Sequence, residues 1–176
     1  ALAAYRWLLD TGTPPSKIAV MGDSAGGGLT LSLLQALRDR ALPLPACAVC
    51  LSPWADLTCS SSSFRKNSRK DPLLPARVVP DFARMYAPDG DLAQPSVSPL
   101  YGDFTGLPPL LIHVGTDEIL LDDSTGVAEK AARDGASVEL KIWPNMIHVF
   151  QALAFMHPAA RQSIREIGAF VARHIP

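Results

Sequence analysis

A single serine stands among small residues where an apolar run ends, which is where a chain would expose a nucleophile. Residues 22–26 read Gly-Asp-Ser-Ala-Gly and match the pattern G-x-S-x-G. The pattern alone is weak, but a strand-like run precedes it and a helix-like run follows it, as a nucleophile elbow requires. Bulky residues at positions 22, 25, 26 and 27 would clash in such a turn, and the helix start would direct N–H groups toward Ser24. The residues therefore indicate nucleophilic catalysis, and a glycine-rich turn before a helix is the alternative.

Ser24 cannot attack an ester unaided at neutral pH, so a general base is expected. Among the four histidines, His148 follows the last predicted strand in a short loop, at the sheet edge where catalytic groups gather. His113 lies inside an apolar strand, His157 begins a helix before a proline, and His174 falls in a last helical turn. Each of those three has a structural explanation. We therefore predict His148 as the base.

A carboxylate should orient this imidazole. Asp117 directly follows the third predicted strand, again at a carboxyl-terminal edge, and its neighbour Glu118 is the rival. Asp122 and Asp123 fall where a helix N-cap is expected, which explains them without catalysis. We predict Asp117 as the acid. The resulting chain order of serine, aspartate and histidine is the order found in α/β-hydrolases.

The elements that must position these residues alternate along the chain. Short apolar or β-branched runs predict strands over 17–21, 46–51, 110–115 and 138–143. Apolar residues at helical spacing predict helices over 2–9, 29–40, 122–137 and 158–175. This alternation implies parallel strands joined by crossover helices, which is an α/β fold.

Residues 56–108 differ from the rest of the chain. Serines and prolines gather there, and only residues 75–87 have helical spacing. A connection of this length is uncommon within a compact domain, so we expect a partly irregular excursion that resembles a cap or lid. The basic cluster at 65–70 fits a solvated loop better than an anion site.

Composition excludes several classes of function. The 176 residues are 48% hydrophobic, which suits one globular domain, and a net charge of -1 gives no attraction to nucleic acid or an anionic membrane. No apolar run approaches the roughly 20 residues of a membrane span, and no signal peptide opens the sequence. Cys47 and Cys50 would lie on opposite faces of a strand, unlike a redox or metal C-x-x-C pair. With Cys59 they indicate reduced thiols and a cytoplasmic location.

Four segments together resemble the landmarks of the hormone-sensitive-lipase-like carboxylesterases, which have the α/β-hydrolase fold: GDSAGGG, SPWADLT, LLIHVGTDEILLDD and MIHVF. The resemblance covers essentially the whole chain. It implies a mostly parallel sheet flanked by helices, with residues near 60–97 as part of a cap insertion.

The same resemblance implies hydrolysis of short-chain acyl esters through an acyl-enzyme intermediate, without a metal or an organic cofactor. Ser24 would attack the carbonyl and His148 would carry the proton. Asp117 would hold the imidazole, and the backbone N–H of Ala25 would supply one oxyanion donor.

One departure from the family concerns that oxyanion hole. The family carries an upstream His-Gly-Gly-Gly segment whose amides complete the hole, and this sequence has none. Because the opening residues also read like the end of a helix, we expect 1–176 to be the C-terminal part of one catalytic domain that lacks its N-terminal strands. Losing one oxyanion donor costs about 10²–10³ in rate. We therefore expect the isolated chain to be nearly inactive and poorly stable.

Two other functions stay open. A serine peptidase or amidase of the same fold usually places an aromatic residue after the nucleophile, where this chain has Ala25. A non-enzymatic ligand-binding relative would lack a working base, whereas His148 is present. The expected partner is a small-molecule ester, and the sequence leaves the formation of a homo-oligomer open.

Overall fold

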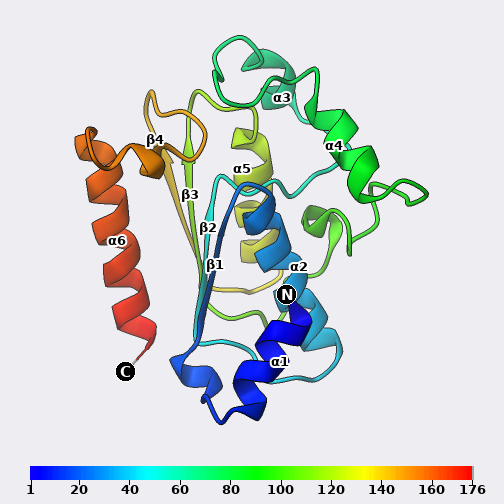
Figure 1. Ribbon diagram of the computed structural model, residues 1–176, viewed down its shortest axis with the longest axis vertical. Coiled ribbons are helices and arrows are strands. Elements are labelled where there is room, and N and C mark those ends of the chain that lie inside the picture. Colours follow the sequence, from blue (N-terminus) through cyan, green and yellow to red (C-terminus); the bar gives the residue numbers. More distant parts are fainter. Residues whose placement is uncertain (176) are drawn as a thin grey trace.

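A parallel sheet with helices on both faces organises the chain (Figure 1). The computed structural model describes residues 1–175, so that Pro176, the last residue of the predicted domain 1–176, lies outside them. The strands stand in the order β1-β2-β3-β4, and every neighbouring pair is parallel. Their bounds are β1 (Ala19–Asp23), β2 (Cys47–Leu51), β3 (Leu110–Gly115) and β4 (Val138–Trp143). Since parallel neighbours need crossover connections, the predicted α/β architecture is confirmed.

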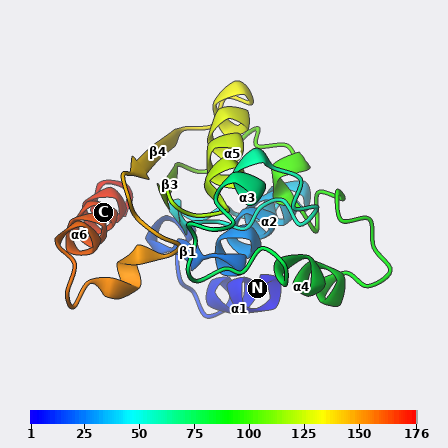
Figure 2. The same cartoon turned by 90° about the horizontal axis from the view of Figure 1, so that it is seen from above.

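Helix α6 lies on one face of the sheet, and α1, α2 and α5 lie on the other (Figure 2). The α-helices are α1 (Leu2–Asp10), α2 (Ala25–Asp39), α3 (Ser62–Lys66), α4 (Val79–Tyr86), α5 (Leu121–Arg133) and α6 (Pro158–His174). Short 3-10 segments occupy Pro15–Lys17, Pro99–Tyr101 and Phe150–Leu153. None of the helices described in residues 1–175 combines the length and the apolar character needed to cross a bilayer.

Strand β2 divides the core into two layers. Ala48 and Cys50 pack in the cluster formed with α2 and α5, whereas Cys47 and Val49 pack with Phe170 of α6. These four of the five β2 residues are fully buried, as expected for a central strand covered on both faces. Cys47 and Cys50 therefore point to opposite faces, as predicted, and both thiols are free. Burial raises the pKa of the Cys50 thiol to about 12.

Most predicted elements are found with small shifts of their ends. The strands predicted over 110–115 and 138–143 match β3 and β4, whereas β1 runs two residues beyond the predicted end at 21. Helix α2 begins at Ala25 and includes the glycines, four residues before the predicted start at 29. Helix α3 was not predicted, because its few residues have no apolar periodicity.

The excursion between β2 and β3 lies over the carboxyl ends of the strands, with α3 above the sheet and α4 to its side (Figure 1). Buried polar side chains attach it to the turn after β3. Asn67 Nδ2 donates to the carbonyl oxygens of Thr116 (3.1 Å) and Glu118 (2.9 Å). Asp71 Oδ2 accepts from the Ile119 N–H (3.0 Å). The excursion is thus fixed to the turn that carries the predicted acid.

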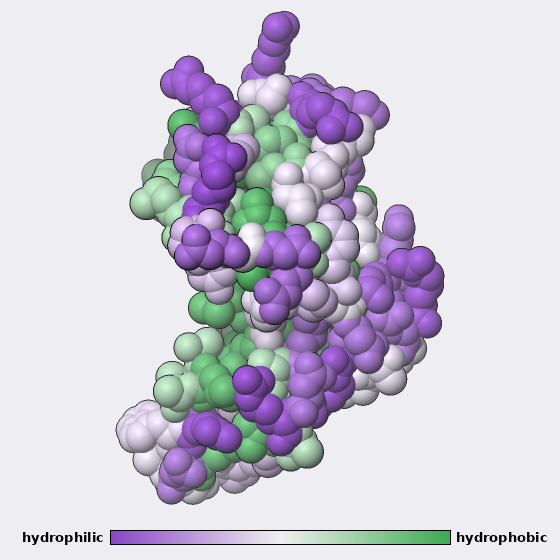
Figure 3. Space-filling view, turned by 90° about the vertical axis from the view of Figure 1, so that its right-hand side faces the viewer, coloured by the Kyte–Doolittle hydropathy of each residue, from purple (hydrophilic) through white to green (hydrophobic). Residues whose placement is uncertain are grey.

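The face formed by α1, α2 and α4 is hollowed and largely hydrophobic in its middle (Figure 3). Large apolar side chains stay exposed on these elements, among them Leu29 of α2 and Tyr86 of α4. Within residues 1–175, β1 pairs with β2 alone, so its other edge carries unpaired backbone groups. This edge and the hollow face lie beside the predicted nucleophile.

Candidate active site

Ser24 occupies a strained turn between β1 and α2. Its backbone angles are φ 53° and ψ −122°, which residues other than glycine rarely adopt. The Ser24 N–H donates to the Leu51 carbonyl (2.8 Å), and the Ser24 carbonyl accepts from the Trp54 N–H (2.9 Å). These bonds tie the turn to β2 and to the loop that follows it. The geometry is that of a nucleophile elbow.

Close backbone approach excludes side chains next to this turn. A Cβ at Gly22 would lie 2.1 Å from the Gly26 carbonyl oxygen, and a Cβ at Gly28 would lie 2.1 Å from the Trp54 carbonyl oxygen. At Gly27 it would meet Pro53 atoms at 2.9 Å. A Cβ at Gly26 would contact nothing within 4 Å. The predicted need for small residues is therefore confirmed at positions 22 and 27 and wrong at 26, and it was missed at 28.

Ala25 is the first residue of α2. The amides in the first turn of a helix lack intrahelical acceptors and lie at the positive end of the helix dipole. The Ala25 N–H, which directly follows Ser24, is therefore suited to stabilise negative charge that forms beside the Ser24 hydroxyl.

The imidazole of His148 pairs with Glu118. Nδ1 of His148 lies 2.9 Å from Glu118 Oε2, and these side chains are 6% and 0% exposed. The side chain of Asp117 is 31% exposed and lies 3.8 Å from Lys70 Nζ. The contact predicted for Asp117 is thus made by the neighbour that the sequence offered as its rival.

Hydrogen bonds explain which of the two carboxylates turns inward. The Gly115 N–H donates to Glu118 Oε1 at 2.5 Å, so the glutamate folds back over the end of β3. The Asp117 backbone instead donates to the Met146 carbonyl (3.0 Å), and its carboxylate stays near solvent. A buried carboxylate needs hydrogen-bond donors around it, and Glu118 has them.

Ser52 touches the same carboxylate, although no motif of the sequence assigned it a role. Its hydroxyl donates to Glu118 Oε1 (2.9 Å) and accepts from the Val149 N–H (3.2 Å). Ser52 is fully buried and has a φ of 46°. The signal that could have found it is its position directly after β2, at the catalytic edge of the sheet.

Sheet register brings the nucleophile and the carboxylate to one edge. Asp23 pairs with Leu51, and Leu51 pairs with His113, so the residues that follow β1, β2 and β3 emerge together. Because Glu118 occupies Nδ1 of the imidazole, Nε2 is the ring nitrogen left for a nucleophile. Within residues 1–175, no hydrogen bond joins the side chains of Ser24 and His148.

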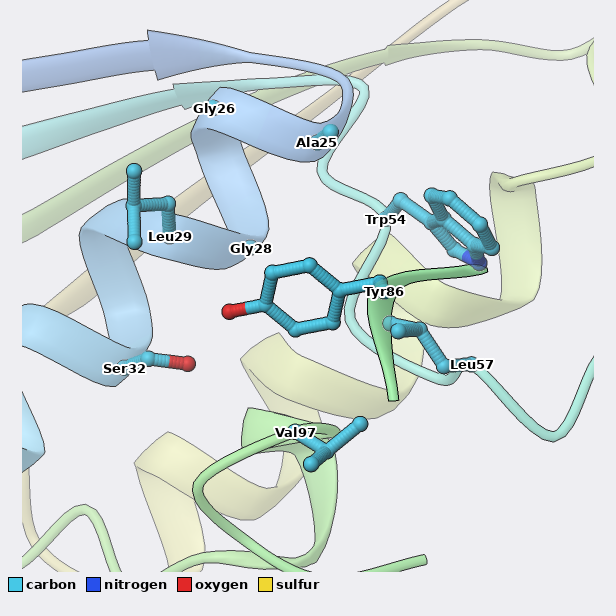
Figure 4. A pocket seen from close by; sticks show the side chains of 9 residues that line it. All are labelled: Ala25, Gly26, Gly28, Leu29, Ser32, Trp54, Leu57, Tyr86 and Val97. Carbon is cyan, nitrogen blue, oxygen red and sulfur yellow. The ribbon is translucent and has the colours of Figure 1, made fainter. Parts of the chain in front are cut away.

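An apolar pocket of about 220 Å³ adjoins the start of α2 (Figure 4). Its lining comes from α2, the loop after β2, α4 and the end of the excursion: Ala25, Gly26, Gly28, Leu29, Ser32, Trp54, Leu57, Tyr86 and Val97. The Tyr86 hydroxyl points toward α2 in Figure 4. Small-molecule pockets usually measure about 300–1,000 Å³, so this one suits a small group. In the described part of the chain, no three His, Cys, Asp or Glu side chains are placed to hold a metal ion.

A family model described as the alpha/beta hydrolase fold matches residues 1–152. The chain belongs to this α/β-hydrolase family. This α/β-hydrolase is 44% identical over 171 residues to an acetyl-hydrolase of Streptomyces hygroscopicus, a match that covers 97% of the chain and 57% of that protein.

Comparison with solved structures supports the same family assignment. The α/β-hydrolase superposes on an esterase from the bacterial hormone-sensitive lipase family with a TM-score of 0.96 and 45% identity, covering 99% of this chain and 59% of that one. It superposes on EstE5, from a crystal soaked by p-nitrophenyl butyrate, with a TM-score of 0.94 and 46% identity, covering 98% and 58%. The resemblance to hormone-sensitive-lipase-like carboxylesterases is confirmed. The chain spans less than two thirds of the length of these relatives.

The other histidines of the α/β-hydrolase have structural partners, as predicted. His113 is buried with Nδ1 2.8 Å from Ser163 Oγ, and burial lowers its pKa to about 4. His157 Nδ1 accepts from a backbone N–H at the start of α6. His174 Nδ1 lies 2.8 Å from the Phe170 carbonyl oxygen in the last turn of α6.

Asp122 and Asp123 do not cap α5, contrary to the prediction. The helix begins at Leu121, so both residues lie inside its first turn. Asp122 Oδ2 accepts from the Ser63 N–H, and Asp123 Oδ2 accepts from two successive backbone N–H groups, at positions 55 and 56, each at 2.9 Å. Burial raises the pKa of Asp123 to about 8. These carboxylates hold the excursion and the loop after β2 against α5.

Proposed function

We propose that the protein is a serine carboxylesterase that hydrolyses short-chain acyl esters with Ser24 as nucleophile, His148 as base and Glu118 as the orienting acid. The observation that carries the proposal is the buried 2.9 Å contact between His148 and Glu118, at the same sheet edge as the strained Ser24. The similarity to an acetyl-hydrolase and to an esterase supports ester hydrolysis as the reaction.

The reaction follows from the roles of these groups. Glu118 accepts a hydrogen bond from the Nδ1–H of His148, which holds the neutral imidazole in the tautomer whose Nε2 is unprotonated and able to act as base. Nε2 takes the hydroxyl proton of Ser24 while Oγ attacks the ester carbonyl, and the oxyanion forms beside the Ala25 N–H. In a free enzyme the contact between serine and histidine is often long, and it tightens when substrate binds.

Collapse of the tetrahedral intermediate completes the first half of the cycle. The bond to the alcohol breaks, His148 gives its proton to the departing oxygen, and Ser24 stays acylated. His148 then takes a proton from water, which attacks the acyl group. The second collapse releases the carboxylic acid and returns the proton to Ser24.

The apolar pocket supports a preference for short chains. Its volume of about 220 Å³ and its mostly aliphatic and aromatic lining suit an acyl or alcohol group of a few carbons. We accordingly expect p-nitrophenyl acetate and butyrate to be turned over faster than the octanoate and palmitate, and the butyrate faster than a matched anilide. Preference for the anilide would favour a peptidase or amidase.

A further part of the proposal concerns completeness of the site. The 176 residues form the C-terminal part of one catalytic domain, in which 56–108 is a cap-like excursion and an upstream segment gives the second oxyanion donor. A missing donor costs about 10²–10³ in rate, so the chain alone should be nearly inactive beside the longer protein. Full ester turnover by the isolated chain as a soluble monomer would refute this part.

Replacing the nucleophile tests the assignment in the longer protein. Ser24→Ala should lower kcat by at least about 10⁴, because knocking out the serine of such a triad removes covalent catalysis altogether. A fluorophosphonate should label the wild-type protein at Ser24 and leave the variant unlabelled, while circular dichroism shows that the fold is intact. Retained turnover in Ser24→Ala would discard the elbow assignment.

A further inference from the structure

We propose that Ser52 is a positioning residue that couples the Glu118 carboxylate to the loop carrying His148. This inference rests on the proposed function, because it assigns Ser52 a part in keeping that acid and that base aligned. The decisive juxtaposition is one buried hydroxyl in contact with both the carboxylate turn and the histidine loop.

The direction of each bond at this hydroxyl is fixed by its partners. The backbone N–H of Val149 can only donate, so Ser52 Oγ accepts from it at 3.2 Å. The single hydroxyl proton is then free for Glu118 Oε1, 2.9 Å away, while Oε2 faces His148. The Ser52 hydroxyl therefore donates to the carboxylate of Glu118 and accepts from the backbone of the loop that carries His148.

The loop held by Ser52 has an unusual backbone. Val149 adopts φ 47° and ψ 43°, a left-handed conformation that is a genuine outlier for a β-branched residue. Such a conformation persists only where the surroundings impose it. Val149 directly follows His148, so a bond to the Val149 N–H fixes the peptide plane on which the imidazole depends.

Ser52 itself is anchored by the sheet. Its N–H donates to the carbonyl of His113 in β3 (2.8 Å), and its side chain has no exposure to solvent. The hydroxyl therefore takes its place from the register of β2 and β3. Glu118 Oε1 keeps the Gly115 N–H as a second donor, so that removing the Ser52 hydroxyl should leave the carboxylate in its turn but uncouple the histidine loop.

The test uses Ser52→Ala and Ser52→Gly in the longer protein. Both remove the hydroxyl, and glycine also suits the φ of 46° without strain, so it separates the loss of the hydrogen bonds from any backbone effect. We expect kcat to fall about tenfold in both variants with KM nearly unchanged, because a hydrogen bond to a charged group is lost and the pocket is untouched.

The dependence of kcat/KM on pH provides a second readout, through its acid limb, where activity falls as the pH is lowered. A carboxylate that has lost one donor attracts a protonated imidazole more strongly, so the limb should move to higher pH in both variants. A role in packing alone would not move it.

Ser163→Ala is the matched control. Ser163 is as buried as Ser52, and its hydroxyl also has two partners, His113 Nδ1 (2.8 Å) and Gln151 Nε2 (3.0 Å), but neither partner is Glu118 or the backbone of the loop at His148 and Val149. This control should lose stability and keep the wild-type kcat and acid limb.

Three outcomes are decisive. Lower kcat and a shifted limb in both Ser52 variants support the proposal. Wild-type kcat and pH profile in Ser52→Gly overturn it, even if Ser52→Ala is impaired, because the backbone would then be the cause. If the wild-type protein hydrolyses no ester and Ser24 is not labelled, the proposed function fails first.

Discussion

The nucleophile elbow after β1 and the carboxylate turn after β3 lie on either side of β2 and are held in different ways. At the elbow, backbone meets backbone: a Cβ at Gly22 has no room, and two main-chain hydrogen bonds fix Ser24. At the carboxylate turn, buried side chains from distant segments do the holding, among them Ser52 and Asn67. The elbow should therefore be disrupted when atoms are added, whereas the alignment of groups at the carboxylate turn should depend on its side-chain hydrogen bonds.

The largest effect is expected at Gly22. Gly22→Ala places Cβ 2.1 Å from the Gly26 carbonyl oxygen, so the elbow must move. We expect a loss of more than about 4 kcal/mol in the free energy of unfolding, together with loss of esterase activity. Gly26→Ala is the control, since its Cβ meets open space within the described chain and alanine favours a helix. Urea unfolding of both variants checks the prediction, and equal stabilities would contradict the steric account of the elbow.

An intermediate effect, and one that depends on pH, is expected at Asp123 beside the carboxylate turn. Burial raises its folded-state pKa to about 8 from 3.8, so between these values the folded protein binds more protons than the unfolded chain. The contribution of Asp123 to the free energy of unfolding is therefore fully present below about pH 4 and is lost as the pH rises toward 8. Asp123→Asn keeps an oxygen for the two backbone donors and removes the titration. Thermal unfolding from pH 4 to 8 should show a flatter profile in this variant, and an identical slope would refute the assignment.

The smallest effect, absent at neutral pH, is expected at His113 on the opposite face of the sheet. Burial lowers its pKa to about 4 from 6.5, so the unfolded chain binds the extra proton between these values. The free energy of unfolding should therefore fall as pH drops from 6.5 to 4. His113→Phe should remove this contribution to the slope, while Ser163 keeps Gln151 as a partner. Unfolding measured at pH 7 and pH 5 tests this, and an unchanged difference between the two would argue against it.

The two regions also differ in how well the sequence predicts them. The elbow follows from local chemistry, because glycines, a serine and the switch from strand to helix all lie within a few residues. His148 follows from strand order for a similar reason. The choice between Asp117 and Glu118 does not, since both stand at the end of β3. It is decided by contacts with Ser52 and His148, which lie 66 and 30 residues away from Glu118.

Tertiary contacts also override local signals at α5. Asp122 and Asp123 match the composition of an N-cap, but their carboxylates receive N–H groups from segments more than 55 residues earlier, at separations of 59, 67 and 68 residues. Helix α3, whose few residues have no apolar periodicity, is likewise stabilised by tertiary contacts with the start of α5, such as the bond from the Asp122 N–H to Ser63 Oγ (3.0 Å). Periodicity reports which face of an element is apolar and carries no information on such pairings.

The most direct test of the account determines which carboxylate, Glu118 or Asp117, orients His148. Glu118→Gln keeps the shape of the side chain but favours the wrong tautomer of His148, so kcat should fall by about 10³–10⁴. Asp117→Asn changes a partly exposed carboxylate and should alter kcat by less than about threefold. Steady-state hydrolysis of p-nitrophenyl butyrate by both variants of the longer protein gives the answer. A severe loss in Asp117→Asn with near-normal turnover in Glu118→Gln would contradict the pairing on which the mechanism depends.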